Sequence, residues 1–91
     1  MSKKSASFVV LNDKGLHTRP STELVKLATR FRSKIRLLHN TSVVNAKSLL
    51  GILMLAAEKG TQIEIEVEGP DADEALAALL KLASNCFHMH Y

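Results

Sequence analysis

The sequence predicts an α+β fold in which helices cover one face of an antiparallel sheet. Two observations lead to this class. Some segments of the 91-residue chain alternate between apolar and polar residues, as half-buried strands do, and others repeat apolar residues every three or four positions, as amphipathic helices do. Because the expected strands carry charged residues on one side, one face of the sheet must be open to solvent, which antiparallel sheets allow.

The first strand and the first helix are expected over residues 5–11 and 18–31. The strand segment is rich in β-branched and aromatic side chains, and the turn-forming cluster over residues 12–15 ends it. In the helix segment, apolar residues recur at spacings of three and four positions, while charged residues occupy the other sides. This helix is expected to begin at His17.

A β-hairpin is expected next. Residues 34–39 alternate between polar and apolar side chains, and Asn40–Thr41 forms a short turn into residues 42–45. Lys34 and Arg36 then lie on the same side of their strand, where they can pair with acidic residues of a neighbouring strand.

The second half of the chain is expected to form a helix, a strand and a final helix. Residues 48–57 are predicted to be an apolar helix that ends at Lys59–Gly60. Residues 62–68 alternate strictly between apolar residues and glutamates, which predicts a strand with one covered face. Asp71, followed by Glu74, resembles a capping box that starts the final helix.

Length and composition predict a single domain over residues 1–91, with a core over about residues 5–84 and a flexible tail over residues 85–91. A lone cysteine, Cys86, excludes an internal disulfide and is typical of a reducing compartment. No secretory leader and no apolar run of membrane-spanning length is recognisable. We therefore expect a cytoplasmic protein without membrane insertion.

Charge is distributed unevenly along the chain. Residues 1–50 hold ten Lys and Arg residues against two acidic residues, whereas residues 51–91 hold two basic residues against seven acidic ones. This polarity favours an acidic partner surface, unless the two sets of charges pair with each other across the fold. The sequence leaves both interpretations open.

The stretch Gly15–Pro20 places His17 at the start of a helix. Backbone N–H groups and the positive end of the helix dipole favour a bound phosphate there, and Arg19 adds a forked set of donors. The same dipole disfavours the imidazolium form, so a neutral nitrogen remains available to attack phosphorus. On spacing alone, the alternative is a helix start with an incidental exposed histidine.

Ser48 stands where the N-cap of the apolar helix is expected. A phosphate on its hydroxyl would meet helix N–H groups and add negative charge to the surface, whereas the alternative is an ordinary capping serine. The helix also carries more apolar residues than one face can bury, so two or three of them should be exposed. These residues are Leu49, Leu50, Ile52, Leu53 and Met54.

An exposed apolar patch ringed by Arg19, Lys26 and Lys47 would suit docking to an acidic, partly apolar partner. The alternative is that the loop and the tail cover it. Cys86, His88 and His90 offer ligand atoms in the tail, but no fourth ligand stands at a recognised spacing, so no metal site is expected. No cofactor is expected either, because no nucleotide-binding glycine loop or catalytic triad is recognisable.

Two stretches together resemble a known family. The heptapeptide over residues 15–21, GLHTRPS, is similar to the active-site signature of HPr, the histidine-containing phosphocarrier of the bacterial phosphoenolpyruvate-dependent phosphotransferase system. The nonapeptide over residues 44–52, VNAKSLLGI, is similar to the second signature of that family, around a regulatory serine. Their separation also matches, and the resemblance covers roughly residues 5–84.

The resemblance implies a four-stranded antiparallel sheet in the order 1-4-2-3 with three helices on one face. It also implies that His17 accepts a phosphoryl group on Nδ1 from phosphorylated enzyme I and passes it to A components of sugar permeases or to related regulators. Arg19 would stabilise the phosphohistidine, and an HPr kinase/phosphorylase would phosphorylate Ser48. The protein would act as a carrier between partner enzymes rather than as an enzyme, and a monomer is expected.

The resemblance also identifies a docking face. It would combine Thr18, Lys26 and Lys47 with the apolar side chains of Leu49, Leu50 and Leu53. Thr18 and Ser21 stand where alanine is more usual in the family, and their hydroxyls are expected beside the phosphate.

Two other functions remain open at this stage. One is a regulatory adaptor, in which phosphorylated Ser48 is recognised by a partner or the chain serves a nitrogen-type branch without sugar transport. The other is a small basic module that binds nucleic acid. Against the latter, the sequence lacks the aromatic residues that stack on bases, and the open face of the sheet would carry three glutamates.

Overall fold

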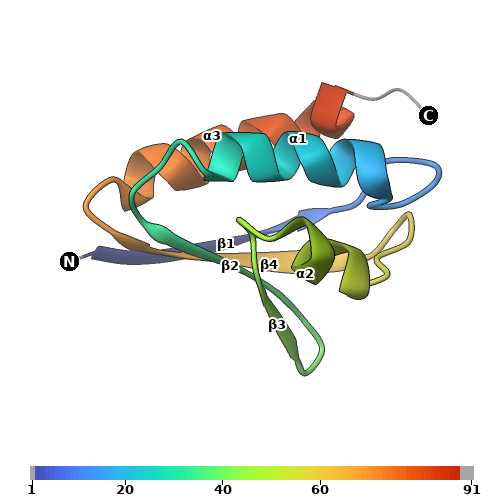
Figure 1. The fold of residues 1–91 in the computed structure, drawn as a ribbon, viewed down its shortest axis with the longest axis horizontal. Coiled ribbons are helices and arrows are strands. Elements are labelled where there is room, and N and C mark those ends of the chain that lie inside the picture. The colour runs from blue at the N-terminus through green and yellow to red at the C-terminus, as the bar shows by residue number, and fades with distance from the viewer. Residues whose placement is uncertain (1, 89–91) are drawn as a thin grey trace.

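The computed structural model describes residues 2–88, which form a sheet covered by helices (Figure 1). Its elements, in chain order, are β1 (Ser2–Val9), α1 (Thr18–Ala28), β2 (Lys34–His39), β3 (Ser42–Asn45), α2 (Leu49–Met54), β4 (Gln62–Gly69), α3 (Ala72–Ser84) and one 3₁₀ turn, η1 (Cys86–His88). The strands are ordered β1-β4-β2-β3, and each neighbouring pair is antiparallel. The predicted fold class and strand order are confirmed.

The two long helices, α1 and α3, lie side by side over one face of the sheet, and α2 packs against α1 and β3 (Figure 1). The alternation in β4 separates the two faces. Ile63, Ile65 and Val67 are fully buried beneath the helices, whereas the intervening glutamates lie on the opposite face. Burial of such side chains is the main stabilising term for a small aliphatic core.

The open face of the sheet carries the expected cross-strand ion pairs. Arg36 on β2 lies opposite Glu66 on β4, and its Nη1 atom is 2.8 Å from the Glu66 carboxylate. Lys3 on β1 approaches the same carboxylate at 3.5 Å. The predicted pairing between hairpin cations and glutamates is therefore confirmed for Arg36.

Helices α1 and α2 both end earlier in the chain than predicted. After Ala28, α1 tightens into a turn in which the N–H groups of Arg30 and Phe31 donate to carbonyls three residues back. The predicted end of α2 at residue 57 is wrong, because Ala56 adopts a left-handed conformation with φ of 50°. A non-glycine residue in this conformation stops a helix.

The predicted capping box of the final helix is wrong. The Asp71 carboxylate does not cap α3 but accepts hydrogen bonds from the Arg32 and Ser33 N–H groups, each at 2.9 Å, and from the Ser33 hydroxyl. These donors, the Ser33 hydroxyl foremost, stabilise the charged form and lower the pKa of Asp71 to about 2. Asp71 thus ties the start of α3 to the segment that enters β2.

The prediction of a flexible tail is wrong for residues 85–88. Phe87 is 1% exposed, and its ring meets that of Phe8 edge to face, with centroids 5.8 Å apart. The Asn12 side-chain amide donates to the Cys86 carbonyl at 2.9 Å. The predicted tail residues 89–91, including His90, lie outside the described residues.

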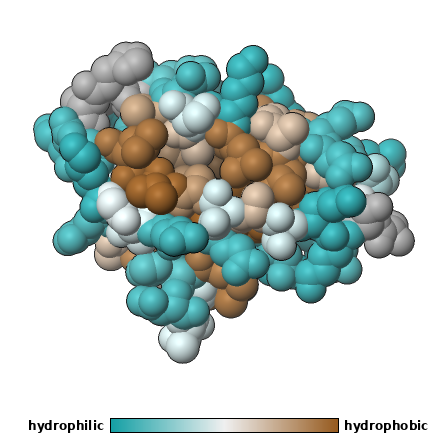
Figure 2. All heavy atoms as spheres, turned by 180° about the vertical axis from the view of Figure 1, so that it is seen from behind, coloured by the Kyte–Doolittle hydropathy of each residue, from teal (hydrophilic) through white to brown (hydrophobic). Residues whose placement is uncertain are grey.

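Apolar surface also occurs on the reverse side of the molecule. Figure 2 shows apolar patches among polar side chains on the face seen from behind. Val9 and Leu11 are about half exposed, and together with Leu80 they line a shallow groove between β1 and α3. Exposure of apolar residues is therefore not restricted to α2.

Candidate functional site

His17 is the N-cap residue of α1. Its backbone is extended, with φ of −80° and ψ of −171°, and its carbonyl accepts the first hydrogen bond of the helix, from the Ser21 N–H at 3.1 Å. The imidazole does not cap the helix, and its Nε2 atom is buried. The ring therefore lies at the positive end of the helix dipole, at the helix start that the sequence predicts, and one of its nitrogens is turned inward.

The loop before His17 is shaped by a close approach between two backbones. Gly15 has φ of 71°, and a Cβ atom on it would lie 2.3 Å from the Ala57 carbonyl oxygen. The same oxygen accepts a hydrogen bond from the Leu16 N–H at 2.9 Å. Glycine is thus required at position 15 for both its conformation and its small size.

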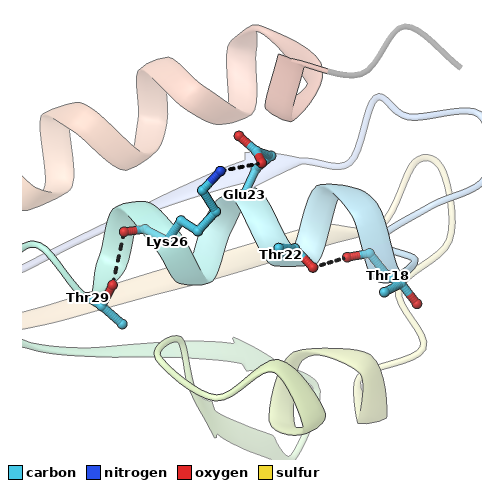
Figure 3. A network of polar contacts seen from close by, with 5 residues as sticks. All are labelled: Thr18, Thr22, Glu23, Lys26 and Thr29. Carbon is cyan, nitrogen blue, oxygen red and sulfur yellow. Dashed lines mark hydrogen bonds and ion pairs between the residues drawn. The ribbon is translucent and has the colours of Figure 1, made fainter.

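Arg19 and Thr18 lie in the first turn of α1, and both are exposed. The Thr18 carbonyl accepts a hydrogen bond from the Thr22 hydroxyl at 2.7 Å within the helix (Figure 3). Pro20 occupies the third helical position, where a backbone N–H is not needed by the helix. The sequence prediction that these residues share one helix start with His17 is confirmed.

Ser21 does not have the position expected from the sequence. Its side chain is fully buried, and its hydroxyl donates to the Leu16 carbonyl at 3.0 Å. The expectation that this hydroxyl lies beside a phosphate is therefore wrong. Residue 21 falls on the inward face of α1, so its hydroxyl reaches the loop that precedes His17.

The two lysines of the predicted docking face are both engaged. Lys26 is exposed and forms an ion pair with Glu23 at 3.2 Å along the outer surface of α1 (Figure 3). The Lys47 ammonium donates to the Phe31 carbonyl at 2.7 Å and so links the β3–α2 connection to the end of α1. Of these two lysines, only Lys26 has a largely exposed side chain.

Ser48 is the N-cap of α2, as predicted. Its hydroxyl oxygen accepts a hydrogen bond from the Gly51 N–H at 3.1 Å. Its backbone is extended and its side chain is partly exposed. Extra negative charge at this oxygen would strengthen the existing contact with the helix N–H.

The apolar helix α2 presents two side chains to solvent. Leu50 is 69% exposed and Met54 is 75% exposed, whereas Ile52 is fully buried. Leu49 and Leu53 are half-buried between these extremes. The prediction of two or three exposed apolar residues is confirmed, but the predicted docking set omitted Met54, which follows Leu50 by four positions and hence shares its helix face.

Ion pairs account for part of the uneven charge. Lys3 and Arg36 contact Glu66, and Lys4 contacts Asp73 at 3.7 Å. In the loop before His17, Asp13 pairs with Lys59 at 2.7 Å. This contact lowers the pKa of Asp13 and raises the pKa of Lys59.

Within residues 2–88, no group of three or more potential ligand side chains is placed to hold a metal ion. In this part of the chain, no helix has the length and apolar character needed to cross a bilayer.

Comparison with known proteins agrees with this arrangement. A family model described as "PTS HPr component phosphorylation site" matches residues 4–85. "Phosphocarrier protein HPr" of Treponema pallidum is 47% identical over 78 residues, which cover 86% of this chain and 89% of the relative.

Two solved structures from Thermoanaerobacter tengcongensis extend the comparison. The crystal structure of HPr-C-His has a TM-score of 0.92 at 34% identity, covering 97% of this chain and 99% of the other. The crystal structure of an HPr dimer has a TM-score of 0.75 at 36% identity, covering 92% of this chain and 97% of the other. Relatives of this kind are named as phosphocarriers rather than catalytic enzymes. Since the family match spans nearly the whole chain and the fold agrees with it, the chain belongs to the HPr family of phosphocarrier proteins of the phosphotransferase system.

Proposed function

We propose that His17 is the phosphoryl acceptor and that Nδ1 is the reacting atom. The observation that carries this proposal is the placement of the imidazole at the start of α1 with Nε2 buried. A nitrogen must be reachable by the incoming phosphorus, so the inward nitrogen is unsuited and Nδ1 remains. When the ring is neutral and its proton is on Nε2, the lone pair that attacks phosphorus is the one on Nδ1.

The transfer itself is an in-line displacement at phosphorus. The lone pair of Nδ1 forms a bond to phosphorus while the bond between phosphorus and the donor group of enzyme I breaks, and the electron pair of that bond returns to the donor group. The charge on the equatorial oxygens is stabilised by the N–H end of α1 and by the Arg19 guanidinium. The reverse geometry delivers the phosphoryl group to an A component.

Docking is proposed to use a face made by α1, from its first turn to Lys26 in its last turn, and by α2, which packs against it. Arg19, Thr18 and Lys26 supply its polar part, Lys47 borders it, and Leu49, Leu50 and Leu53 with the added Met54 supply its apolar part. An exposed apolar centre with basic neighbours suits partners whose surfaces are acidic and partly apolar. Small contacts of this kind are released quickly, as a relay requires.

The carrier function is tested with enzyme I and labelled phosphoenolpyruvate. The wild-type chain should gain an acid-labile, alkali-stable label, and the His17→Ala variant should gain none. A label that persists in this variant, or no label on the wild-type chain, would contradict the proposal. Adding a candidate A component then shows whether the label moves to a sugar permease or to a regulatory branch without transport.

A second proposal concerns regulation at Ser48. Its hydroxyl oxygen already accepts the Gly51 N–H, so a phosphate there would keep this donor and gain the helix dipole without unfolding α2. The added charge would lie within the docking face and disfavour an acidic partner. Incubation with ATP and an HPr kinase/phosphorylase should give an acid-stable label that Ser48→Ala abolishes, and a label retained in that variant would assign the modification elsewhere.

Nucleic-acid binding is the weakest of the three functions. The open sheet face carries three glutamates, and Arg36 is already paired with one of them.

We also propose that the working form is a monomer, although a similar HPr has been crystallised as a dimer. Size-exclusion chromatography with light scattering, followed by a salt titration against RNA and DNA, tests both statements.

A further inference from the structure

Both backbone polar groups of Leu16, the residue before His17, are hydrogen-bonded. The Leu16 N–H donates to the Ala57 carbonyl at 2.9 Å, and the Leu16 carbonyl accepts the Ser21 hydroxyl at 3.0 Å. Ser21 also donates its own N–H to the His17 carbonyl at 3.1 Å. Ser21 thus donates hydrogen bonds to two successive backbone carbonyls, that of Leu16 and that of His17.

The Ser21 contact differs from the other hydroxyl contacts of this helix. Thr22 and Thr29 also donate to carbonyls, but these belong to α1 itself and the contacts are exposed (Figure 3). The Ser21 hydroxyl reaches back five positions, past the start of the helix, and the contact is buried. It therefore connects the helix to the loop before the reactive residue rather than strengthening the helix.

We propose that Ser21 is a positioning residue for His17, an inference that rests on the proposed role of His17 as the phosphoryl acceptor. The Leu16 carbonyl and the His17 N–H belong to one rigid peptide plane, so a bond to that carbonyl fixes the plane from which the His17 side chain departs. Rotation of this plane would redirect the imidazole. In-line transfer is sensitive to such redirection, because a displacement of about 1 Å can slow a reaction by about 100-fold.

The test replaces Ser21 by Ala and uses Ser33→Ala as the matched control. Ser33 is equally buried and its hydroxyl also makes one hydrogen bond, but to Asp71, beyond the other end of α1. Two properties are measured on each folded variant: the ¹⁵N signals and titration of the His17 ring by NMR, and the rate of phosphoryl acceptance from phosphorylated enzyme I. The NMR measurement reports on ring placement whether or not transfer occurs.

For Ser21→Ala we expect shifted His17 signals and acceptance slowed by about tenfold, which is less than the roughly 100-fold loss for a full 1 Å displacement. Ser33→Ala should leave both properties unchanged while losing stability. Wild-type signals and rate in Ser21→Ala, or equal changes in Ser33→Ala, would overturn the positioning role. Failure of the wild-type chain to accept phosphate would instead overturn the proposed function, and the NMR comparison would still decide whether Ser21 orients the ring.

Should Ser21→Ala fail to fold, Ser21→Cys replaces it. The thiol has the same shape as the hydroxyl, is somewhat larger and is a much weaker donor, so it fills the site without restoring the hydrogen bond. The expected changes at His17 are in the same direction. If this variant also fails to fold, the hydroxyl is required for the structure as a whole and the specific positioning role is rejected.

Discussion

The contact between Gly15 and Ala57 determines where the loop before His17 can lie. A Cβ at position 15 would meet the Ala57 oxygen at 2.3 Å, and φ of 71° is unfavourable for other residues. The backbone of Gly15 therefore has no alternative that keeps the Leu16 hydrogen bond in place.

The sequence did not predict the hydrogen-bond partner of Ser21, the other residue that contacts Leu16. A helical period shows which face of the helix a residue occupies, but it does not identify a hydrogen-bond acceptor outside the helix.

Gly15→Ala should destabilise the fold by about 2–4 kcal/mol, because the strain of the left-handed conformation adds to displacement of the Ala57 carbonyl. Acceptance at His17 should fall as well. Thermal unfolding and labelling from phosphoenolpyruvate measure the two effects. Gly60→Ala is the matched control: Gly60 has φ of 90° with no atom within 4 Å of the added Cβ, so only the conformational cost of about 1 kcal/mol is expected. Equal losses in both variants would refute the steric account.

At the scale of the elements, α2 carries exposed apolar side chains for docking and a buried one for folding, so variants of the two kinds should have different effects. Leu50→Ala combined with Met54→Ala should leave stability within about 0.5 kcal/mol of the wild type, since both side chains are mostly exposed. Affinity for unphosphorylated enzyme I, which binds without transferring a phosphoryl group, should fall by about tenfold, which corresponds to loss of about 1.4 kcal/mol of interface energy. Calorimetric titration measures it.

Ile52→Ala on the same helix is the control. This fully buried side chain should cost about 2–5 kcal/mol of folding energy when truncated. At a temperature where the variant is folded, its affinity should change less than that of the double variant. A larger loss of affinity in Ile52→Ala would indicate that the outer face of α2 is not the docking surface.

The short turn η1 is held by its aromatic residue. Phe87→Ala should cost about 3–5 kcal/mol, because a fully buried ring and its contact with Phe8 are both lost. Leu11→Ala, which removes a side chain that is 48% exposed, should cost much less. Urea unfolding compares the two variants. Similar values would show that residues 86–88 do not form part of the core in solution.

Asp71 joins α3 to the entrance of β2, and its titration should affect folding. Its pKa is about 2 in the folded state and about 3.9 in an unfolded chain. Because the folded pKa is the lower one, the stabilisation is complete above about pH 4 and is lost as the pH falls toward 2. Urea midpoints between pH 5 and pH 2 should therefore fall less steeply in Asp71→Asn than in the wild type. Asp73→Asn removes a carboxylate from an exposed position of α3 without touching the contacts of Asp71 and is the matched control.

At the scale of the whole molecule, the order of elements and the polarity of the sheet could be predicted from the sequence. Alternation in β4 and the periodicity of α1 arise from burial on one side, which is a local pattern. The role of Asp71 and the packing of Phe87 could not be predicted this way. Their partners, Ser33 and Phe8, lie far away in the sequence and are brought close only by the complete fold.

Some residues of the candidate site could likewise be predicted from the sequence, and others could not. His17, Arg19 and Ser48 were identified because short motifs place them at helix starts, and the structure has them there. Met54 was among the apolar residues considered for exposure but was left out of the docking set, although its spacing from Leu50 was a usable signal. The buried state of Ser21 and the anchoring of Lys47 depend on how α1 meets its neighbouring loops, which spacing does not encode.

The order of pairing in the sheet has a consequence for how the chain matures during synthesis. Within residues 2–88, β1 pairs with β4 alone, and the loop after β1 is fastened to Cys86, 74 positions after Asn12. Contacts over such separations form slowly, because a long stretch of chain must be ordered before they are gained. Until β4 has been synthesised, β1 has no strand to pair with, and we expect the histidine that follows β1 to reach its final setting only after residues 86–88 are also available.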